Sequence, residues 1–255
     1  MKKWGMLLTA VLMAAVVLSA CGTKKSDNLV LGLSADFPPY EFHITNDQGK
    51  DEIVGFDVEI AKEIAKDLGK ELEIKDMNFD SLLNELESGR VDLVISGLSP
   101  TPDRAEQVGL SNIYYTAEQA IVTLTENKDK YATMESLEGA NIGVQKSSIQ
   151  EEIAQGIPGA KLTSLTKIND IIMQLQSGRV DAAVLEGPVA EAFVKNVEGI
   201  TITDAKPETE DDGYVVGVKK SNQELLDQVN KTLERLINDG SIDKFVAEAS
   251  ALAEK

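Results

Sequence analysis

The sequence predicts an α/β protein built from two similar halves. A seven-residue unit occurs twice, as LESGRVD at 86–92 and as LQSGRVD at 175–181, an offset of 89 residues. In each copy the glycine suits the left-handed conformation that closes a helix, and the apolar run that follows suits a strand buried on both faces. Ligands of open α/β sheets bind outside the carboxyl ends of strands. We therefore expect a ligand between the halves, near 96–104 and 186–188.

The first 20 residues have the pattern of an export signal. A basic start, an apolar core and small residues before position 21 give this pattern, and the apolar run is short for a membrane-spanning helix. The tetrapeptide LSAC, ending at Cys21, resembles the lipobox of bacterial lipoproteins, in which cleavage leaves a lipidated cysteine. We expect residues 21–28 to form a lipidated tether. An ordinary signal peptide with a chance cysteine is the alternative.

Composition narrows the function classes. The formal charge is −18, and removal of Lys2 and Lys3 with the signal makes it −20, which argues against a nucleic-acid partner. Cys21 is the only cysteine, so a disulfide or a cysteine metal cluster within one chain is excluded. His43 is the only histidine and is expected in a surface loop, so neither a Ser-His-Asp triad nor a histidine-rich metal site is predicted. No cofactor or metal is expected.

The predicted elements follow apolar periodicity and capping signals. A hairpin turn is favoured over a calcium loop at 46–52, because the ligand spacing of a calcium loop is missing. Asp80 is expected to N-cap the helix before the first repeat. Strands are expected at 28–34, 72–74, 93–95, 113–115 with 120–124, 141–144, 182–185 and 214–218, and helices at 57–69, 82–88, from 149, 170–176, 188–195, 223–239 and 241–252.

Several side chains are candidate ligand contacts. Phe37 lies on a loop stiffened by two prolines, and Phe79 is expected near the same strand ends. Arg104 follows a Thr-Pro-Asp helix start, where a guanidinium and free amides together suit a carboxylate. Ser147 and Ser148 precede another helix and suit a small anion. The alternatives are core phenylalanines, a surface salt bridge for the arginine, and simple capping by the serines.

The segments DFPPYEF, GFDVEIAKEIAKDLG and SGRVDLVISGLSPTPDR, with the second SGRVD, resemble the bacterial extracellular solute-binding proteins of family 3. These are the polar amino acid receptors of ABC importers, and the resemblance covers essentially the whole mature chain. It implies a two-lobe, periplasmic-binding-protein-like (type II) fold with mixed sheets, flanking helices and two crossover hinge strands. Lobe I is expected at 29–117 and 206–255, and lobe II at 118–205.

The resemblance implies a site for the ligand's α-carboxylate. Arg104 corresponds to the arginine that grips this carboxylate, and Ser99 to the hydroxyl beside it. Ser148, with the amide of Ile149, corresponds to the contact from the second lobe. The pair Ser147-Ser148 stands where Gly-Thr is usual in the family.

It also implies a site for the α-ammonium and the ligand side chain. Gly97 corresponds to a backbone acceptor for the ammonium, and Glu186 to an acid, usually aspartate, that pairs with it. Phe37, Phe79 and Gln145 correspond to walls around the ligand side chain. Ser34 stands where an aspartate is common, which weakens the case for a histidine-type pocket.

The expected function is capture of one free amino acid by lobe closure and its delivery to an ABC permease in the membrane. Arg104 and Glu186 fall in different lobes, so a zwitterion would bridge them and favour closure. A neighbouring arginine would keep Glu186 ionised. We expect a monomer anchored by lipid to the outer face of the cell membrane, of Gram-positive type, or in the periplasm if Gram-negative.

Two other function classes stay open from the residues alone. An enzyme on this fold, such as a prephenate or arogenate dehydratase or a lytic transglycosylase, would use the abundant carboxylates. A surface adhesin lipoprotein would bind a host protein. The identity of the amino acid is also open: Asp36, Glu41 and Gln145 favour a polar or basic side chain, but Asp36 and Glu41 are equally well explained as solvated loop acids.

Overall fold

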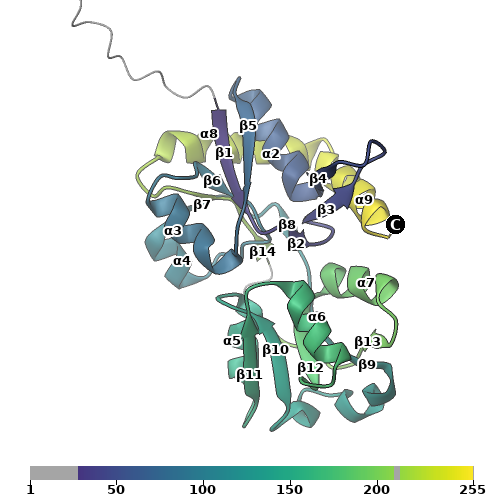
Figure 1. Cartoon of the computed structure of the whole chain (residues 1–255). Helices are drawn as coiled ribbons and strands as arrows, with labels where there is room; N and C mark the ends of the chain where they lie inside the picture. The colour runs from purple at the N-terminus through teal and green to yellow at the C-terminus, as the bar shows by residue number, and fades with distance from the viewer. Residues whose placement is uncertain (1–27, 210–212, 255) are drawn as a thin grey trace, which may run out of the picture.

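The computed structural model describes residues 28–209 and 213–254. The predicted signal peptide, Cys21 and nearly all of the predicted tether lie outside these residues. Figure 1 shows two bodies, one above the other, each built around its own sheet. We call them the first lobe and the second lobe.

The first lobe contains a five-stranded mixed sheet in the order β5-β1-β6-β15-β7. Strand β1 pairs in parallel with β5 and β6, whereas β15 runs antiparallel to β6 and β7. The strands are β1 (Asn28–Leu33), β5 (Glu71–Asp76), β6 (Leu93–Val94), β7 (Gly109–Leu110) and β15 (Gly217–Val218). The last strand comes from the end of the chain, so the first lobe is assembled from two separate segments.

The second lobe repeats this plan in the order β11-β10-β12-β9-β13. Strand β10 pairs in parallel with β11 and β12, and β9 runs antiparallel to β12 and β13. The strands are β9 (Gln119–Leu124), β10 (Asn141–Gln145), β11 (Lys161–Leu165), β12 (Ala182–Glu186) and β13 (Ile200–Ile202). The predicted α/β class with mixed sheets is confirmed.

The repeated unit has the same structural task in both lobes. Gly89 and Gly178 have φ angles of 75° and 67°, as their positions after a helix require. The carboxylate of Asp92 accepts a hydrogen bond from the Val30 amide at 2.8 Å, and that of Asp181 accepts one from the Asn141 amide at 2.9 Å. In each lobe the repeat therefore ties the central strand to its first neighbour.

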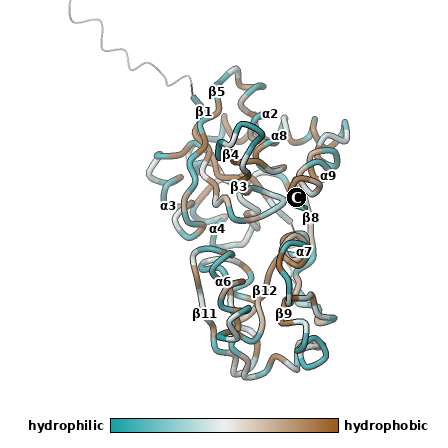
Figure 2. The backbone as a smooth tube through the Cα atoms, turned by 45° about the vertical axis from the view of Figure 1, so that its right-hand side comes forward, coloured by the Kyte–Doolittle hydropathy of each residue, from teal (hydrophilic) through white to brown (hydrophobic). Residues whose placement is uncertain are grey.

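Helices flank both sheets, and hydrophobic residues concentrate along the strands (Figure 2). The helices are α2 (Phe56–Asp67), α3 (Leu82–Glu87), α4 (Pro102–Gln107), α5 (Ile149–Gln155), α6 (Ile168–Gln176), α7 (Gly187–Asn196), α8 (Gln223–Asn238) and α9 (Ser241–Ala253). Short 3₁₀ turns lie at η2 (Phe79–Ser81), η3 (Thr125–Asn127), η4 (Asp129–Tyr131) and η5 (Glu135–Leu137). No helix within 28–209 and 213–254 is long and apolar enough to cross a membrane.

Two local predictions are wrong. Asp80 lies inside η2 instead of capping a helix, because the turn already begins after Asn78, and its carboxylate pairs with Lys146 of the second lobe at 2.8 Å. His43 lies in strand β3 (Glu41–Thr45), where its side chain points to solvent and contacts Asp51. The predicted hairpin is confirmed: β3 pairs with β4 (Asp51–Val54), and β2 (Asp36–Phe37) pairs with the other edge of β3.

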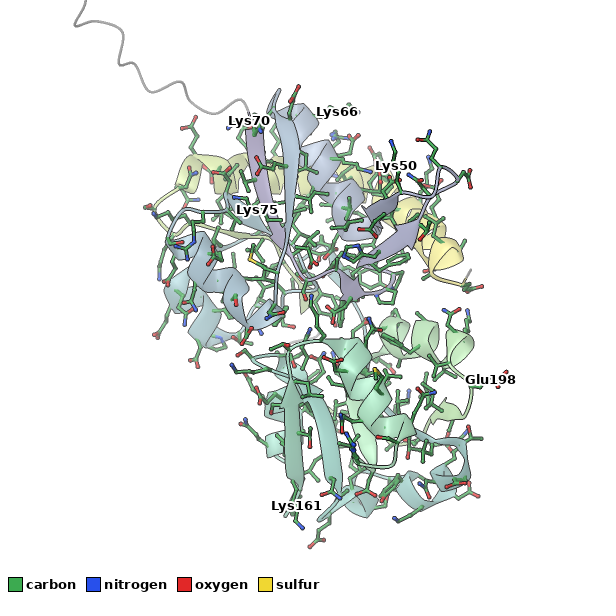
Figure 3. All side chains as sticks on the ribbon, in the orientation of Figure 1. Lys50, Lys66, Lys70, Lys75, Lys161 and Glu198 are labelled. Atoms are coloured by element: carbon green, nitrogen blue, oxygen red, sulfur yellow. The ribbon has the colours of Figure 1, made fainter. Side chains whose placement is uncertain are left out.

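The chain crosses between the lobes twice, once between β7 and β9 and once between β13 and β15. The two crossings pair as β8 (Tyr115–Thr116) and β14 (Gly213–Tyr214), and the Tyr114 amide donates to the Tyr214 carbonyl at 2.9 Å. Charged residues at the far ends of the lobes, such as Lys70 and Lys161 in Figure 3, lie on the outer surface. Apolar side chains from both lobes share one buried cluster, so the lobes are in contact.

Candidate functional site

A cavity with about 290 Å³ of empty space lies between the lobes, where strands β1, β6 and β10 end. That volume includes space open to solvent. Both lobes contribute to its wall. The lining residues are Ser34, Phe37, Phe79, Ser96, Gly97, Ser99 and Arg104 from the first lobe and Gln145, Ser148, Ile149 and Gln150 from the second.

Arg104 is a buried cation in this wall. Helix α4 begins with Thr101 as N-cap and Pro102 at its first position, which sets Arg104 in the first turn. The guanidinium donates to the carbonyl oxygen of Ser99 at 2.9 Å and to that of Ser147, across the lobe boundary, at 2.9 Å. It also lies over the Phe79 ring, 5.5 Å from the ring centre. A positively charged group held this firmly is suited to recognising a carboxylate.

The second-lobe wall is the start of helix α5. The Ser148 hydroxyl donates to the Gln145 carbonyl at 2.7 Å and accepts from the Glu151 amide at 3.2 Å. Ser148 is therefore an N-cap, as one reading of the sequence predicted, and it also lies on the cavity wall. Ser147 adopts a φ of 65°, and this turn directs its carbonyl oxygen to Arg104.

Gly97 brings the backbone of the first lobe to the cavity. Its φ is +52°, and a Cβ atom built there would lie 2.7 Å from a ring carbon of Phe37. The Gly97 amide donates to the carboxylate of Asp57 at 2.9 Å, and the Tyr114 hydroxyl donates to the same carboxylate at 2.8 Å. Because Tyr114 belongs to a crossing between the lobes, this carboxylate connects the cavity wall to that crossing.

A second buried acid, Glu41, lies behind this wall and accepts a hydrogen bond from the Ser96 hydroxyl. Burial and the nearby charge of Asp57 raise the pKa of Glu41 well above its usual range. Burial also raises the pKa of Asp57, to about 6, against hydrogen bonds from Gly97 and Tyr114 that lower it. Burial therefore favours the protonated form of Glu41. Neither Glu41 nor Asp36 is a solvated loop acid, since both are buried.

Glu186 is placed differently from the expectation. It ends β12 and caps α7, accepting from the Val189 amide at 3.2 Å and from the Tyr40 hydroxyl at 2.5 Å. It is fully buried and is not among the lining residues of the cavity. Burial raises the pKa of Glu186 to about 8. The expectation that a neighbouring arginine keeps it ionised is wrong, because its hydrogen-bond partners are the neutral Tyr40 hydroxyl and a backbone amide.

The structure brings most of the predicted residues to one cavity. Of the sequence-predicted set, the cavity wall contains all but Glu186, which Tyr40 separates from Phe37; the Tyr40 and Phe37 rings are 5.1 Å apart. Ser34, Ser96 and Gln150 also line the cavity but were not among the predicted ligand contacts. Ser96 and Gln150 could have been predicted. Ser96 follows the predicted strand 93–95, and Gln150 lies in the first turn of the helix after Ser148. Within the described ranges, no cluster of three or more His, Cys, Asp or Glu side chains is arranged to hold a metal ion.

Comparison with known families identifies the class. The chain matches the bacterial extracellular solute-binding proteins, family 3, over residues 29–248, and it belongs to this family. Its two-lobe fold is that of the solved neighbours, which are two-domain amino acid binding proteins.

Several relatives and solved structures are named for the amino acid that they bind. The arginine-binding extracellular protein ArtP of Bacillus subtilis is 39% identical, with 96% of each chain covered. A probable histidine-binding protein of Campylobacter jejuni is 29% identical, covering 96% of this chain and 98% of the relative. The crystal structure of AbpA from Streptococcus pneumoniae bound to L-arginine has a TM-score of 0.87 and 39% identity, covering 90% of this chain and 97% of AbpA. An ancestral arginine-binding protein bound to glutamine has a TM-score of 0.76 and 38% identity, covering 87% and 97%.

Proposed function

We propose that this protein is the substrate-binding component of an ABC importer, which captures a free amino acid between its lobes and passes it to a membrane permease. The observation that carries the proposal is the cavity at the lobe boundary with the buried guanidinium of Arg104 in its wall. Membership of the solute-binding family supports it. The ligand we propose first is arginine, which the names of several relatives and structural neighbours specify.

The ligand's α-carboxylate is proposed to bind at Arg104, with the Ser99 and Ser148 hydroxyls and the Ile149 amide beside it. All four residues line the cavity, and they approach it from both lobes. Contact with both lobes lets the ligand stabilise the closed arrangement over the open one. The rings of Phe37 and Phe79 and the amide of Gln145 are proposed to pack around the ligand side chain.

The α-ammonium is proposed to bind at the Gly97 carbonyl. Glu186 then acts as a buried counter-charge behind Tyr40, and not as a direct contact. Its raised pKa, about 8, means that the ligand-free protein holds a proton there at pH 7. Arrival of the cationic ammonium favours the ionised form. Binding is therefore expected to release this proton.

The charge around Ser34 supports a cationic ligand side chain. Ser34 lines the cavity, and its hydroxyl donates to Asp36 at 2.8 Å. Asp76 lies close by, and Lys167 is 3.9 Å from Asp36 and 3.5 Å from Asp76. Two acids against one lysine leave this end of the cavity with a net negative charge. A guanidinium or ammonium at the end of the ligand side chain is favoured there.

The proposal is tested by isothermal titration calorimetry of the purified mature chain with each of the twenty amino acids. We expect arginine to bind most tightly. Heat of binding with a different amino acid but none with arginine would show that arginine is not the ligand. The protein would still be an amino acid binding protein. A chain that binds none of the twenty would refute the proposed function.

We also propose that the protein is a monomer without enzymatic activity. The relatives are binding proteins, and Tyr40 separates Glu186, the acid with a pKa of about 8, from the Phe37 wall of the cavity. Incubation with prephenate, arogenate or peptidoglycan should give no turnover. Turnover that is lost in Glu186→Gln would favour the enzyme alternative.

The exported protein is proposed to be held at the membrane by lipid on Cys21. Replacement Cys21→Ala should move the protein from the membrane fraction to the soluble fraction and abolish labelling by a palmitate analogue. Unchanged fractionation and labelling would refute the anchor without affecting the binding function.

A further inference from the structure

Helix α6 of the second lobe begins without a cap of its own. Its N-cap residue is Lys167, whose side chain makes no capping hydrogen bond. The free amide of Ile168 instead donates to the carboxylate of Asp36 at 2.6 Å. Asp36 belongs to β2 of the first lobe, so this helix is capped from across the lobe boundary. Figure 1 shows α6 just below β2 at that boundary.

The carboxylate of Asp36 is held in place from both sides. Its other oxygen accepts from the Ser34 hydroxyl at 2.8 Å and lies 3.9 Å from the Lys167 ammonium. Lys167 itself reaches the first lobe, donating to Ser34 at 3.2 Å and lying 3.5 Å from Asp76. Asp36 is 5% exposed, which takes this contact out of bulk water. A charge-assisted hydrogen bond in such surroundings is stronger than one on the surface.

Asp36 is close to the cavity but is not on its wall. Its neighbours Ser34 and Phe37 line the cavity, whereas Asp36, Lys167 and Ile168 do not. Asp36 can therefore affect ligand affinity in two ways, through its charge at the Ser34 end of the cavity and through the arrangement of the lobes.

We propose that Asp36 is a positioning residue that caps helix α6 only when the lobes are closed, and so raises the affinity for the ligand without touching it. This rests on the proposed capture of an amino acid by lobe closure. When the lobes separate, the hydrogen bond between the Ile168 amide and the Asp36 carboxylate breaks, and water hydrates both groups. The closed state alone has the cap, and a ligand that binds the closed state gains from it.

The test compares binding of the proposed ligand, arginine, to the mature wild-type chain and three variants by stopped-flow fluorescence and calorimetry. Loss of one cap predicts about a tenfold weaker Kd for Asp36→Ala, about 1.4 kcal/mol. The loss should appear as faster dissociation with an unchanged association rate, because the closed complex opens more readily. The melting temperature of the ligand-free protein should not change, whereas that of the saturated protein should fall.

Two variants sharpen the comparison. Asp36→Asn retains a side-chain oxygen for the Ile168 amide but loses the charge, so it should recover part of the affinity, whereas a role of the Asp36 charge alone predicts no recovery. Asp80→Ala removes another acid that reaches across the boundary, but its partner Lys146 is 54% exposed and no helix is capped. We expect that control to change Kd by less than about twofold.

Three outcomes would overturn the proposal. These are a Kd for Asp36→Ala within twofold of wild type, a slower association rate with unchanged dissociation, or an equal fall in melting temperature with and without ligand. Failure of wild type to bind arginine would instead count against the proposed ligand, and the comparison would be repeated with the amino acid that does bind. Failure to bind any amino acid would remove the proposed function itself.

Discussion

Replacement of Arg104 by alanine tests the proposed recognition of the ligand's carboxylate. The guanidinium is 7% exposed and is held by the carbonyl oxygens of Ser99 and Ser147, each at 2.9 Å. Truncation would leave the bound carboxylate buried without its positive partner. It would also remove one direct hydrogen bond between the lobes, the bond to Ser147.

The expected loss of binding free energy in Arg104→Ala follows from the burial of the guanidinium. Removal of one partner of a buried charge pair typically costs about 3–5 kcal/mol, which corresponds to a hundredfold or greater rise in Kd. Arg104→Lys keeps the charge but loses the planar pair of donors, so we expect a smaller loss. Both variants should keep the fold, because Arg104 makes its contacts at the cavity and not within either sheet.

Isothermal titration calorimetry with arginine measures this effect. The matched control is Arg90→Ala, since Arg90 is an exposed arginine of the first repeat that pairs with Glu85 at the surface. Its affinity should equal that of wild type. A loss of less than tenfold for Arg104→Ala, with the protein folded, would refute the role of Arg104 in binding the carboxylate.

Two further predictions concern the protonation of Glu186 and the backbone conformation at Gly97. Burial raises the pKa of Glu186 from 4.5 to about 8, so the ligand-free fold should lose stability as pH rises through this window, and binding at pH 7 should release a fraction of a proton. Affinity should therefore rise with pH up to about 8; calorimetric heats that do not depend on the ionisation enthalpy of the buffer would contradict this. Gly97→Ala should weaken binding roughly tenfold, because its Cβ would lie 2.7 Å from the Phe37 ring. Gly89→Ala is the control, with a similar positive φ but its nearest contact at 3.8 Å; equal behaviour of the two variants would exclude the clash.

Local signals in the sequence were sufficient for most of the cavity wall. The run Thr101-Pro102-Asp103-Arg104 specifies the start of α4, and this start places the arginine in the wall. Phe37 was predicted from two prolines that exclude a helix. Such signals work because they depend on residues within one turn of each other.

The positions of three acids could not be predicted in this way. Asp36 accepts a hydrogen bond from the Ile168 amide, 132 residues away, and Glu186 accepts one from the Tyr40 hydroxyl, 146 residues away. Glu41 is buried against Ser96, which belongs to another strand end. For Asp36 and Glu41, nothing within a few residues indicates that water is excluded.

The two repeated α/β units, the helix starts and the strand ends at which the cavity lies were predictable from the amino-acid sequence, because capping, glycine conformation and apolar periodicity are local properties of the chain. The packing of the folded chain set which carboxylates have raised pKa values, among them Glu41, Asp57 and Glu186. Their pKa values depend on burial and on partners that the packing of one lobe against the other brings together. The same packing decided that Asp36 caps a helix of the opposite lobe and that Glu186 lies behind Tyr40 and not on the cavity wall.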